Sequence, residues 1–331
     1  MKNIKVILYF CFILIGCTLF GPHRITGNDI IKQKKQPDYT VQMAFLWDGS
    51  DIEPHALRAV RSFRKDYPEI KVKHFVNPVY FIRAESTDFV SQLKSMIMEG
   101  DTVAIHIAPW KSLVEKSNVS FRNGPTFWGD ALSIQHCVND CGLDVSVNVY
   151  SVEDIRKILL TSISVFQEAG FSKPNGMVIG GWQSTDLLQK LAWEQGIRED
   201  YSAIAPDSLG GYFDHFPIGK WIKRQWTEIS AFAQPVLKDV GYGVMMQVPI
   251  NGGSPEYLTS DQILQRFLVN TGQNHTSQID TMVFTIGVFP STMFHTVGTL
   301  RRTVEQIKAA ASRKAIALRF NSATDNETLA H

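Results

Sequence analysis

Residues 101–110 read Asp101-Thr-Val-Ala-Ile-His-Ile-Ala-Pro-Trp110, and this stretch decides the fold. Its β-branched residues alternate with small or polar ones, which is the pattern of a β-strand. Pro109 has no amide hydrogen, so the hydrogen-bonded ladder cannot continue past it. The strand therefore places the imidazole of His106 and the indole of Trp110 at its carboxyl end. Because sites in barrel-like α/β folds lie at that end of the strands, we interpret this stretch as the mouth of a catalytic site.

Outward from this strand, strand and helix patterns alternate from Tyr39 onward. Strands are predicted at residues 41–46, 71–76, 102–107, 175–179, 244–248, 281–286 and 315–320. Helices are predicted at residues 54–65, 88–99, 151–170, 187–196, 258–269 and 298–311, the third beginning with a Ser-x-x-Asp cap at Ser151. This alternation indicates either one parallel barrel or a doubly wound sheet, and the pattern alone does not choose between them.

Residues 117–143 interrupt the alternation. Turn signals interleaved with aromatic residues predict a long structured loop, and such a loop inside a compact domain usually has a function. The loop carries Cys137 and Cys141, which form either a local disulfide or two free thiols. A metal group with the neighbouring His136 is a third interpretation. It is disfavoured because no second pair of metal ligands lies at finger-like spacing.

The amino terminus differs from the rest of the chain, whose 331 residues are 44% hydrophobic and 20% charged, a composition typical of globular proteins. A short basic region and an eleven-residue apolar run end at Gly16-Cys17, which resembles a bacterial lipoprotein signal. We therefore predict a signal peptide at residues 1–16, lipidation of Cys17, a tether at 17–38, a folded domain at 39–322 and a polar tail at 323–331. An ordinary signal peptide or an uncleaved anchor are the alternatives.

Loss of the signal peptide removes Lys2 and Lys5 and leaves 31 basic residues against 32 acidic ones, a net charge of −1. A nearly neutral chain has no electrostatic footprint for nucleic acid. The predicted location is the bacterial cell envelope, periplasmic or extracytoplasmic. The only predicted contact with the membrane is the lipid anchor.

Six fragments, each near the end of a predicted strand, together resemble the polysaccharide deacetylase family (NodB homology). They are Leu46-Trp-Asp-Gly49, His74-Phe-Val-Asn-Pro78, His106-Ile-Ala-Pro-Trp110, Pro125-Thr-Phe-Trp-Gly129, Gly180-Gly-Trp182 and Gly287-Val-Phe-Pro290. The resemblance covers roughly residues 40 to 320 and implies a single distorted (β/α) barrel. It also implies a metal-dependent removal of N-acetyl groups from polysaccharide.

Such an enzyme holds a divalent metal with one Asp and two His, and uses a second Asp, an Arg and a late His for proton transfer. By this resemblance Asp48 and His106 are retained metal positions. Ala108 replaces the second His, Trp47 replaces the base, Val178 replaces the Arg and Phe289 replaces the late His. Zinc typically needs three protein ligands, so the catalytic positions are interpreted as degenerate. His74 or His295 can restore a ligand in principle, but a satisfied strand-end His and a helix-start His are the favoured interpretations.

Apart from the metal positions, the predicted mouth of the site is rich in aromatic residues. Sugars lay their apolar ring faces on aromatic planes, and polar groups meet their hydroxyls. The residues predicted to line a glycan cleft are Trp47, Asn77, Trp110, Trp128, Gly181 and Trp182. The competing interpretation is that these tryptophans are packed core, as large aromatic residues usually are.

Three functions follow from these observations. The leading hypothesis is a catalytically degenerate, deacetylase-like envelope lipoprotein that binds a glycan, such as peptidoglycan, or a protein partner, with no cofactor. The second is an active de-N-acetylase that acts on N-acetylated polysaccharide or peptidoglycan and holds zinc or another divalent metal at a rebuilt site. The third is a structural assembly subunit in which the cleft is vestigial.

Overall fold

The structure is a computed structural model that describes residues 38–83, 87–129, 140–272 and 281–321. Its strands form one sheet in the order β6-β7-β5-β4-β3-β2-β1-β8, with β9 paired to the start of β1. The strands are β1 (Asp38–Trp47), β2 (Val72–Val76), β3 (Thr102–Ile107), β4 (Gly176–Ile179), β5 (Glu199–Asp200), β6 (Val236–Asp239), β7 (Val244–Gln247), β8 (Thr281–Val288) and β9 (Leu318–Phe320). Every pairing is parallel except that of β6 with β7.

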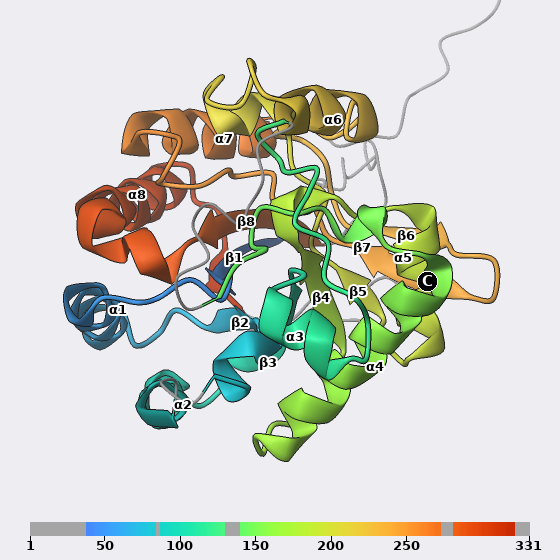
Figure 1. Ribbon diagram of the computed structural model, residues 1–331. Helices are drawn as coiled ribbons and strands as arrows, with labels where there is room; N and C mark the ends of the chain where they lie inside the picture. The colour runs from blue at the N-terminus through green and yellow to red at the C-terminus, as the bar shows by residue number, and fades with distance from the viewer. Residues whose placement is uncertain (1–37, 84–86, 130–139, 273–280, 322–331) are drawn as a thin grey trace, which may run out of the picture. The chain divides into compact units, whose positions relative to one another are not determined.

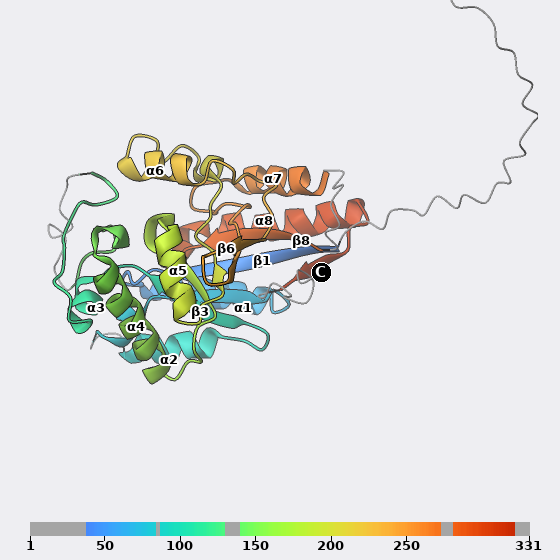
Figure 2. The same ribbon diagram turned by 90° about the vertical axis from the view of Figure 1, so that its right-hand side faces the viewer.

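Helices surround this sheet, as parallel strands with crossover connections require. They are α1 (Pro54–Asp66), α2 (Thr87–Met96), α3 (Lys111–Lys116), α4 (Val152–Glu168), α5 (Asp186–Glu194), α6 (Pro217–Gln225), α7 (Ser260–Gly272) and α8 (Met293–Arg313). Helix α8 packs against both α1 and α7, and Figure 2 shows α7 and α8 on the side of β8. None of the helices that the structure describes has the length and hydropathy needed to cross a bilayer.

A few backbone and side-chain contacts join the segment after β7 to β8, at the open edge of the sheet. After β7 the chain continues beside β5, where the amide of Ile250 donates to the carbonyl of Ala203 at 2.7 Å. It then reaches β8, where Gly253 forms a parallel bridge with Ile286. Asn251 joins the two segments, because its Nδ2 donates to the carbonyl of Val283 and its Oδ1 accepts from the amide of Thr285. The mixed sheet is therefore curled into a half-barrel surrounded by helices, which confirms the predicted barrel architecture over a doubly wound sheet.

Alternation along β1 divides the core into two layers. Phe45 and Trp47 pack in the outer layer beneath the helices, whereas Ala44 and Leu46 lie inside the barrel. The amino-terminal end of the interior is polar, since Lys73 pairs there with Glu199. The carboxyl end of the same interior opens into the cavity described below.

A buried polar network ties the outer layer together. Arg64 Nη2 donates to both carboxylate oxygens of Asp101, at 2.8 and 2.7 Å. His74 Nε2 lies 3.4 Å from the same carboxylate, and its Nδ1 accepts from Trp47 Nε1 at 3.1 Å. Burial lowers the pKa of His74, so the ring stays neutral. Burial would raise the pKa of Asp101, but hydrogen bonds from His74 and from backbone amides lower it below the usual value.

Most predicted elements are present with shifted ends. Ser151 caps α4 as predicted, accepting from the amide of Asp154. β1 begins at Asp38, the last residue of the predicted tether, and α8 begins at Met293, five residues before its predicted start. Helices α3 and α6 and the short strands β5 and β6 were not predicted. The predicted signal peptide, nearly all of the tether and the tail lie outside the described residues.

Candidate functional site

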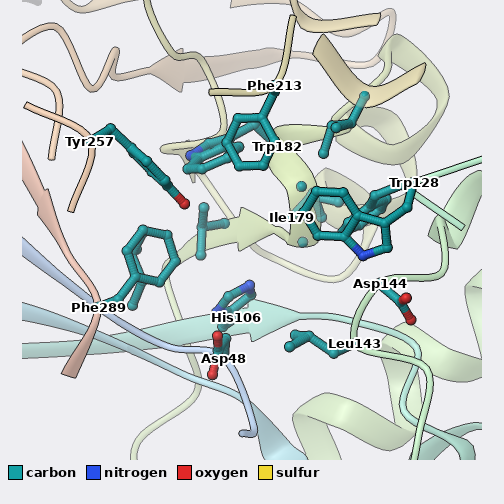
Figure 3. A pocket seen from close by; sticks show the side chains of 16 residues that line it. Asp48, His106, Trp128, Leu143, Asp144, Ile179, Trp182, Phe213, Tyr257 and Phe289 are labelled. Carbon is teal, nitrogen blue, oxygen red and sulfur yellow. The ribbon is translucent and has the colours of Figure 1, made fainter. Parts of the chain in front are cut away.

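A cavity of about 300 Å³ lies at the carboxyl end of the parallel strands (Figure 3). Its volume is at the lower end of the range of small-molecule sites. The described residues that line it are mostly apolar or aromatic: Leu46, Phe127, Trp128, Leu143, Val178, Ile179, Gly180, Gly181, Trp182, Phe213, Ile218, Tyr257 and Phe289, together with the polar Asp48, His106 and Asp144. The strand ends thus meet in an aromatic cavity with few polar groups.

Asp48 and His106 lie side by side on one wall of this cavity (Figure 3). Asp48 directly follows β1, and its Oδ1 accepts from the amide of Ser50 at 3.0 Å. Burial raises the pKa of Asp48, although the bonds from Ser50 oppose the rise. His106 belongs to β3 and is 4% exposed. Burial lowers the pKa of His106 to about 3, despite its bond to the backbone of Trp47, so the imidazole is neutral at physiological pH.

These donors do not fit a resident metal ion. Among the described residues, no three His, Cys, Asp or Glu side chains come close enough together to hold one. Zinc typically takes three protein ligands, and Asp48 with His106 supplies two. Ala108, where the resemblance expects the second His, is buried and has no ligating atom. His74 is not a substitute, because it is held in the outer layer between Trp47 and Asp101, and His295 is exposed on α8.

Aromatic rings form the opposite walls. Trp128 is 41% exposed and stacks on Phe213, with ring centroids 5.7 Å apart. Trp182 lies deeper and meets Phe289 edge to face at 6.0 Å. Both Gly181 and Trp182 have positive φ, and a side chain at Gly181 would come within 2.6 Å of Phe127. This turn therefore needs glycine to bring the Trp182 ring into the cavity.

Two positions that the family resemblance assigns to catalytic groups are apolar parts of this lining. Val178, where the resemblance expects an Arg, lies inside the barrel in β4. Phe289, where it expects a His, follows β8 and packs against Trp182 and Tyr257. Neither side chain can ligate a metal or transfer a proton.

Trp47, Asn77 and Trp110 do not line the cavity, contrary to prediction. Trp47 alternates with Leu46 along β1, so its side chain points away from the barrel interior and is 1% exposed. Asn77 is buried and caps the 3₁₀ turn Pro78–Phe81, where its Oδ1 accepts from the amide of Val79 at 3.0 Å. Trp110 lies behind the site, because its Nε1 donates to the carbonyl of Asp48 at 2.8 Å.

Trp110 and Arg83 hold the loop that carries Asp48. Gly49 has φ 96°, and a Cβ there would lie 2.3 Å from Trp110 Nε1, so no larger residue fits. Arg83 Nη1 donates to the carbonyl of Gly49 at 2.7 Å, and its guanidinium lies 4.3 Å from the Trp110 ring centroid. Arg83 Nε also donates to Asp140 at 3.0 Å, which ties this loop to residues 140–145.

Several residues of the site were missed in the sequence. Tyr257 and Phe213 lie in segments without a strand or helix pattern, and the hydroxyl of Tyr257 points into the cavity (Figure 3). Glu256 is next to Tyr257 and accepts from Thr292 Oγ1 at 3.3 Å. Partial burial raises the pKa of Glu256 to about 7, and the charge of Asp48 adds to the rise. The prediction of a functional loop at residues 117–143 did indicate part of the site, because Phe127, Trp128 and Leu143 line the cavity.

The cysteine predictions remain partly outside the described residues. Cys141 is disulfide-bonded in the structure. Cys137, its predicted partner, and Cys17, the predicted lipidation site, belong to segments that are not described, as does His136. The pairing of Cys137 with Cys141 and the lipidation of Cys17 stay predictions.

Comparison with known proteins identifies relatives by structure only. No protein-family profile matches the chain, and no curated protein matches it. A Mycobacterium smegmatis protein assigned as a polysaccharide deacetylase superposes with a TM-score of 0.50 and 12% identity, over 87% of this chain and 88% of that one. A CE4 family pseudoenzyme of Bacillus anthracis gives a TM-score of 0.40 and 11% identity, over 86% of this chain and 68% of that one. A family 4 carbohydrate esterase of Streptomyces lividans gives a TM-score of 0.40 and 9% identity, over 86% and 92%.

Proposed function

We propose that this chain, which has the fold of polysaccharide deacetylases, binds a glycan in its aromatic cavity without hydrolysing it. The observation that carries the proposal is the composition of the cavity wall. Aromatic rings dominate where the strands end, and Asp48 and His106 stand without a third metal ligand among the described residues. Such a site retains affinity for sugar rings but lacks the groups for metal-assisted hydrolysis.

The aromatic walls suit the apolar faces of a sugar ring. Trp128 offers a partly exposed indole at the mouth, and Trp182 with Phe213 continues the aromatic surface inward. Amphipathic rings of this kind favour ligands with one apolar face and a polar edge. Asp48, His106 and the Tyr257 hydroxyl supply the polar groups that would meet sugar hydroxyls.

The loss of catalysis follows from the replaced side chains. Val178 and Phe289 stand in the lining where proton-transfer groups are needed, and Trp47 is buried outside the cavity. Asp48 and His106 remain in the lining, but the family resemblance assigns them to metal binding and not to proton transfer. The proposed protein therefore holds its glycan unchanged, as a binding protein.

We further propose a place for this binding protein in the cell. Residues 1–16 act as a lipoprotein signal peptide, Cys17 carries the lipid, and residues 17–38 tether the barrel of residues 39–322 to the membrane. Peptidoglycan and other envelope glycans are the ligands within reach of such a tether. An envelope protein is the alternative partner.

Trp128→Ala is expected to weaken glycan binding by about tenfold, or about 1.4 kcal/mol, because it removes the exposed aromatic plane at the mouth. Isothermal titration calorimetry of the purified protein with tetra-N-acetylchitotetraose measures the change in affinity. Tyr242→Ala is the matched control, because Tyr242 is an exposed aromatic residue in the β6–β7 hairpin and does not line the cavity. Equal binding by the wild type and Trp128→Ala would refute the proposal, as would failure of the wild type to bind either this oligomer or its de-N-acetylated form.

A further inference from the structure

We propose that the cavity selects a glycan that carries a free amino group over the same glycan in its N-acetylated form. The inference rests on the proposed function and adds the chemical class of the ligand. Two independent features support it: the sign of the charge around the cavity and an unpartnered polar group in its wall.

The charged side chains in the described lining are both acidic. Asp48 lies beside His106, and Asp144 lies near Trp128 (Figure 3); no Lys or Arg is among the described lining residues. A third acid, Glu256, is adjacent to the lining residue Tyr257. The charge of Arg83 opposes the rise in the pKa of Asp48, but its guanidinium is engaged with Gly49, Asp140 and Trp110 behind the site. A cationic ligand would thus meet acidic side chains and no basic one in the described lining, whereas an anionic sugar would be repelled.

Asp48 lies near enough to Tyr257 and Glu256 for its charge to contribute to their raised pKa values. Burial raises the pKa of Tyr257 well above its usual value, and the negative charges of Glu256 and Asp48 raise it further. The same coupling with Asp48 contributes to the raised pKa of Glu256. Asp48 and Tyr257 therefore line the same region of the cavity, where an ammonium group would meet the Asp48 carboxylate.

His106 supplies the unpartnered acceptor. The ring donates its hydrogen to the backbone of Trp47, and a neutral imidazole carries a single N–H. Nδ1 is buried and has no hydrogen-bond partner in the described structure, so it presents an unused lone pair. A buried acceptor without a partner is unfavourable, and a donor on the ligand would satisfy it.

An amino group matches this pair of acceptors better than an acetamido group does. An ammonium donates three hydrogen bonds, so it can serve the Asp48 carboxylate and the His106 ring together. An acetamido nitrogen donates one hydrogen bond, and the acetyl oxygen is an acceptor that would find another acceptor in Asp48. The amino sugar therefore gains both the charge attraction and the additional donors.

The test compares two oligosaccharides that differ only in their acetyl groups. Wild-type protein is titrated with chitotetraose, which has free amines, and with tetra-N-acetylchitotetraose, at a pH at which the amines are protonated. We expect the free-amine oligomer to bind about tenfold more tightly or better. In Asp48→Asn the ratio of the two affinities is expected to fall to about threefold or less, since the variant removes the nearest negative charge.

Controls separate this inference from general attraction of cations and from the proposed function. Tetralysine carries similar charge without sugar rings, and equally tight binding of tetralysine would overturn the inference. Asp66→Asn, a surface acid of α1, should keep the wild-type ratio. Equal or tighter binding of the acetylated oligomer, together with a weakened Trp128→Ala, overturns the inference and leaves the proposed function standing. Failure of both oligomers to bind overturns the proposed function itself.

Discussion

Asp101→Asn is expected to lower the free energy of unfolding by about 3–5 kcal/mol, the cost of leaving a buried charge without its partner. The Arg64 and Asp101 side chains are 4% and 0% exposed, so water cannot replace the lost carboxylate. The carboxylate also accepts from the amides of Val72 and Met98, and it faces His74. One substitution thus disturbs β2, β3 and the helix layer together.

Urea denaturation followed by circular dichroism measures this loss. Asp66→Asn is the matched control, because Asp66 pairs with Arg301 on the surface, where both side chains are more than a third exposed. Exposed pairs contribute about 0–1 kcal/mol, so the control should change stability little. If both variants lose the same free energy, the buried network does not hold the barrel as described.

Trp47→Ala is expected to cost about 3–5 kcal/mol, the typical loss for an aromatic side chain removed from a packed core. Trp47 is 1% exposed, stacks on His74 and packs against Phe89. Its Nε1 is also the donor to His74 Nδ1, which would lose its partner. Thermal and urea unfolding measure the loss, and Trp128→Ala should be much less destabilising because Trp128 is 41% exposed.

A substitution of Trp47 also distinguishes a residue of the glycan cleft from a residue of the outer layer. As a cleft residue it would contribute to glycan affinity, but as an outer-layer residue it would not. Trp47→Phe keeps an aromatic ring in the core and is expected to bind tetra-N-acetylchitotetraose as the wild type does. A selective loss of glycan affinity in a stably folded Trp47→Phe variant would place this indole at the binding site.

Local patterns in the sequence predicted the framework of the fold well. The strand at residues 102–107 and the Ser151 cap depend on neighbouring residues, so both were predictable and both are present. The region between α5 and β7 gave no periodic signal, because β5 is two residues long and β6 is exposed. The contact between the segment after β7 and β8 combines a single backbone bridge at Gly253 with hydrogen bonds from the Asn251 side chain, and neither leaves a periodic pattern in the sequence.

The site was less predictable because its residues converge from distant segments. The motif fragments indicated Asp48, His106 and Trp182 as neighbours, and the structure places all three on one cavity. The fragments did not indicate side-chain direction. Trp47 adjoins Asp48 in sequence but faces the opposite side of the sheet. Phe213 and Tyr257 reach the cavity from connections whose paths are set by tertiary packing.

The residues that stabilise the fold and the residues that line the site therefore lie on opposite faces of the same strands. The buried ion pair of Arg64 with Asp101 lies outside the barrel, whereas the cavity lies inside it. Asp48 joins the two regions through Trp110 and Arg83, which hold its loop from behind. Site residues can therefore be substituted without disturbing the buried ion pair.

Acetate release tests the central claim most directly. Purified wild-type protein is incubated with tetra-N-acetylchitotetraose and added zinc, while binding of the same oligomer is measured in parallel. We expect binding, with acetate release no faster than in a His106→Ala variant. Acetate release by the wild type that requires stoichiometric zinc and is abolished in His106→Ala would contradict the central claim and would establish a working de-N-acetylase.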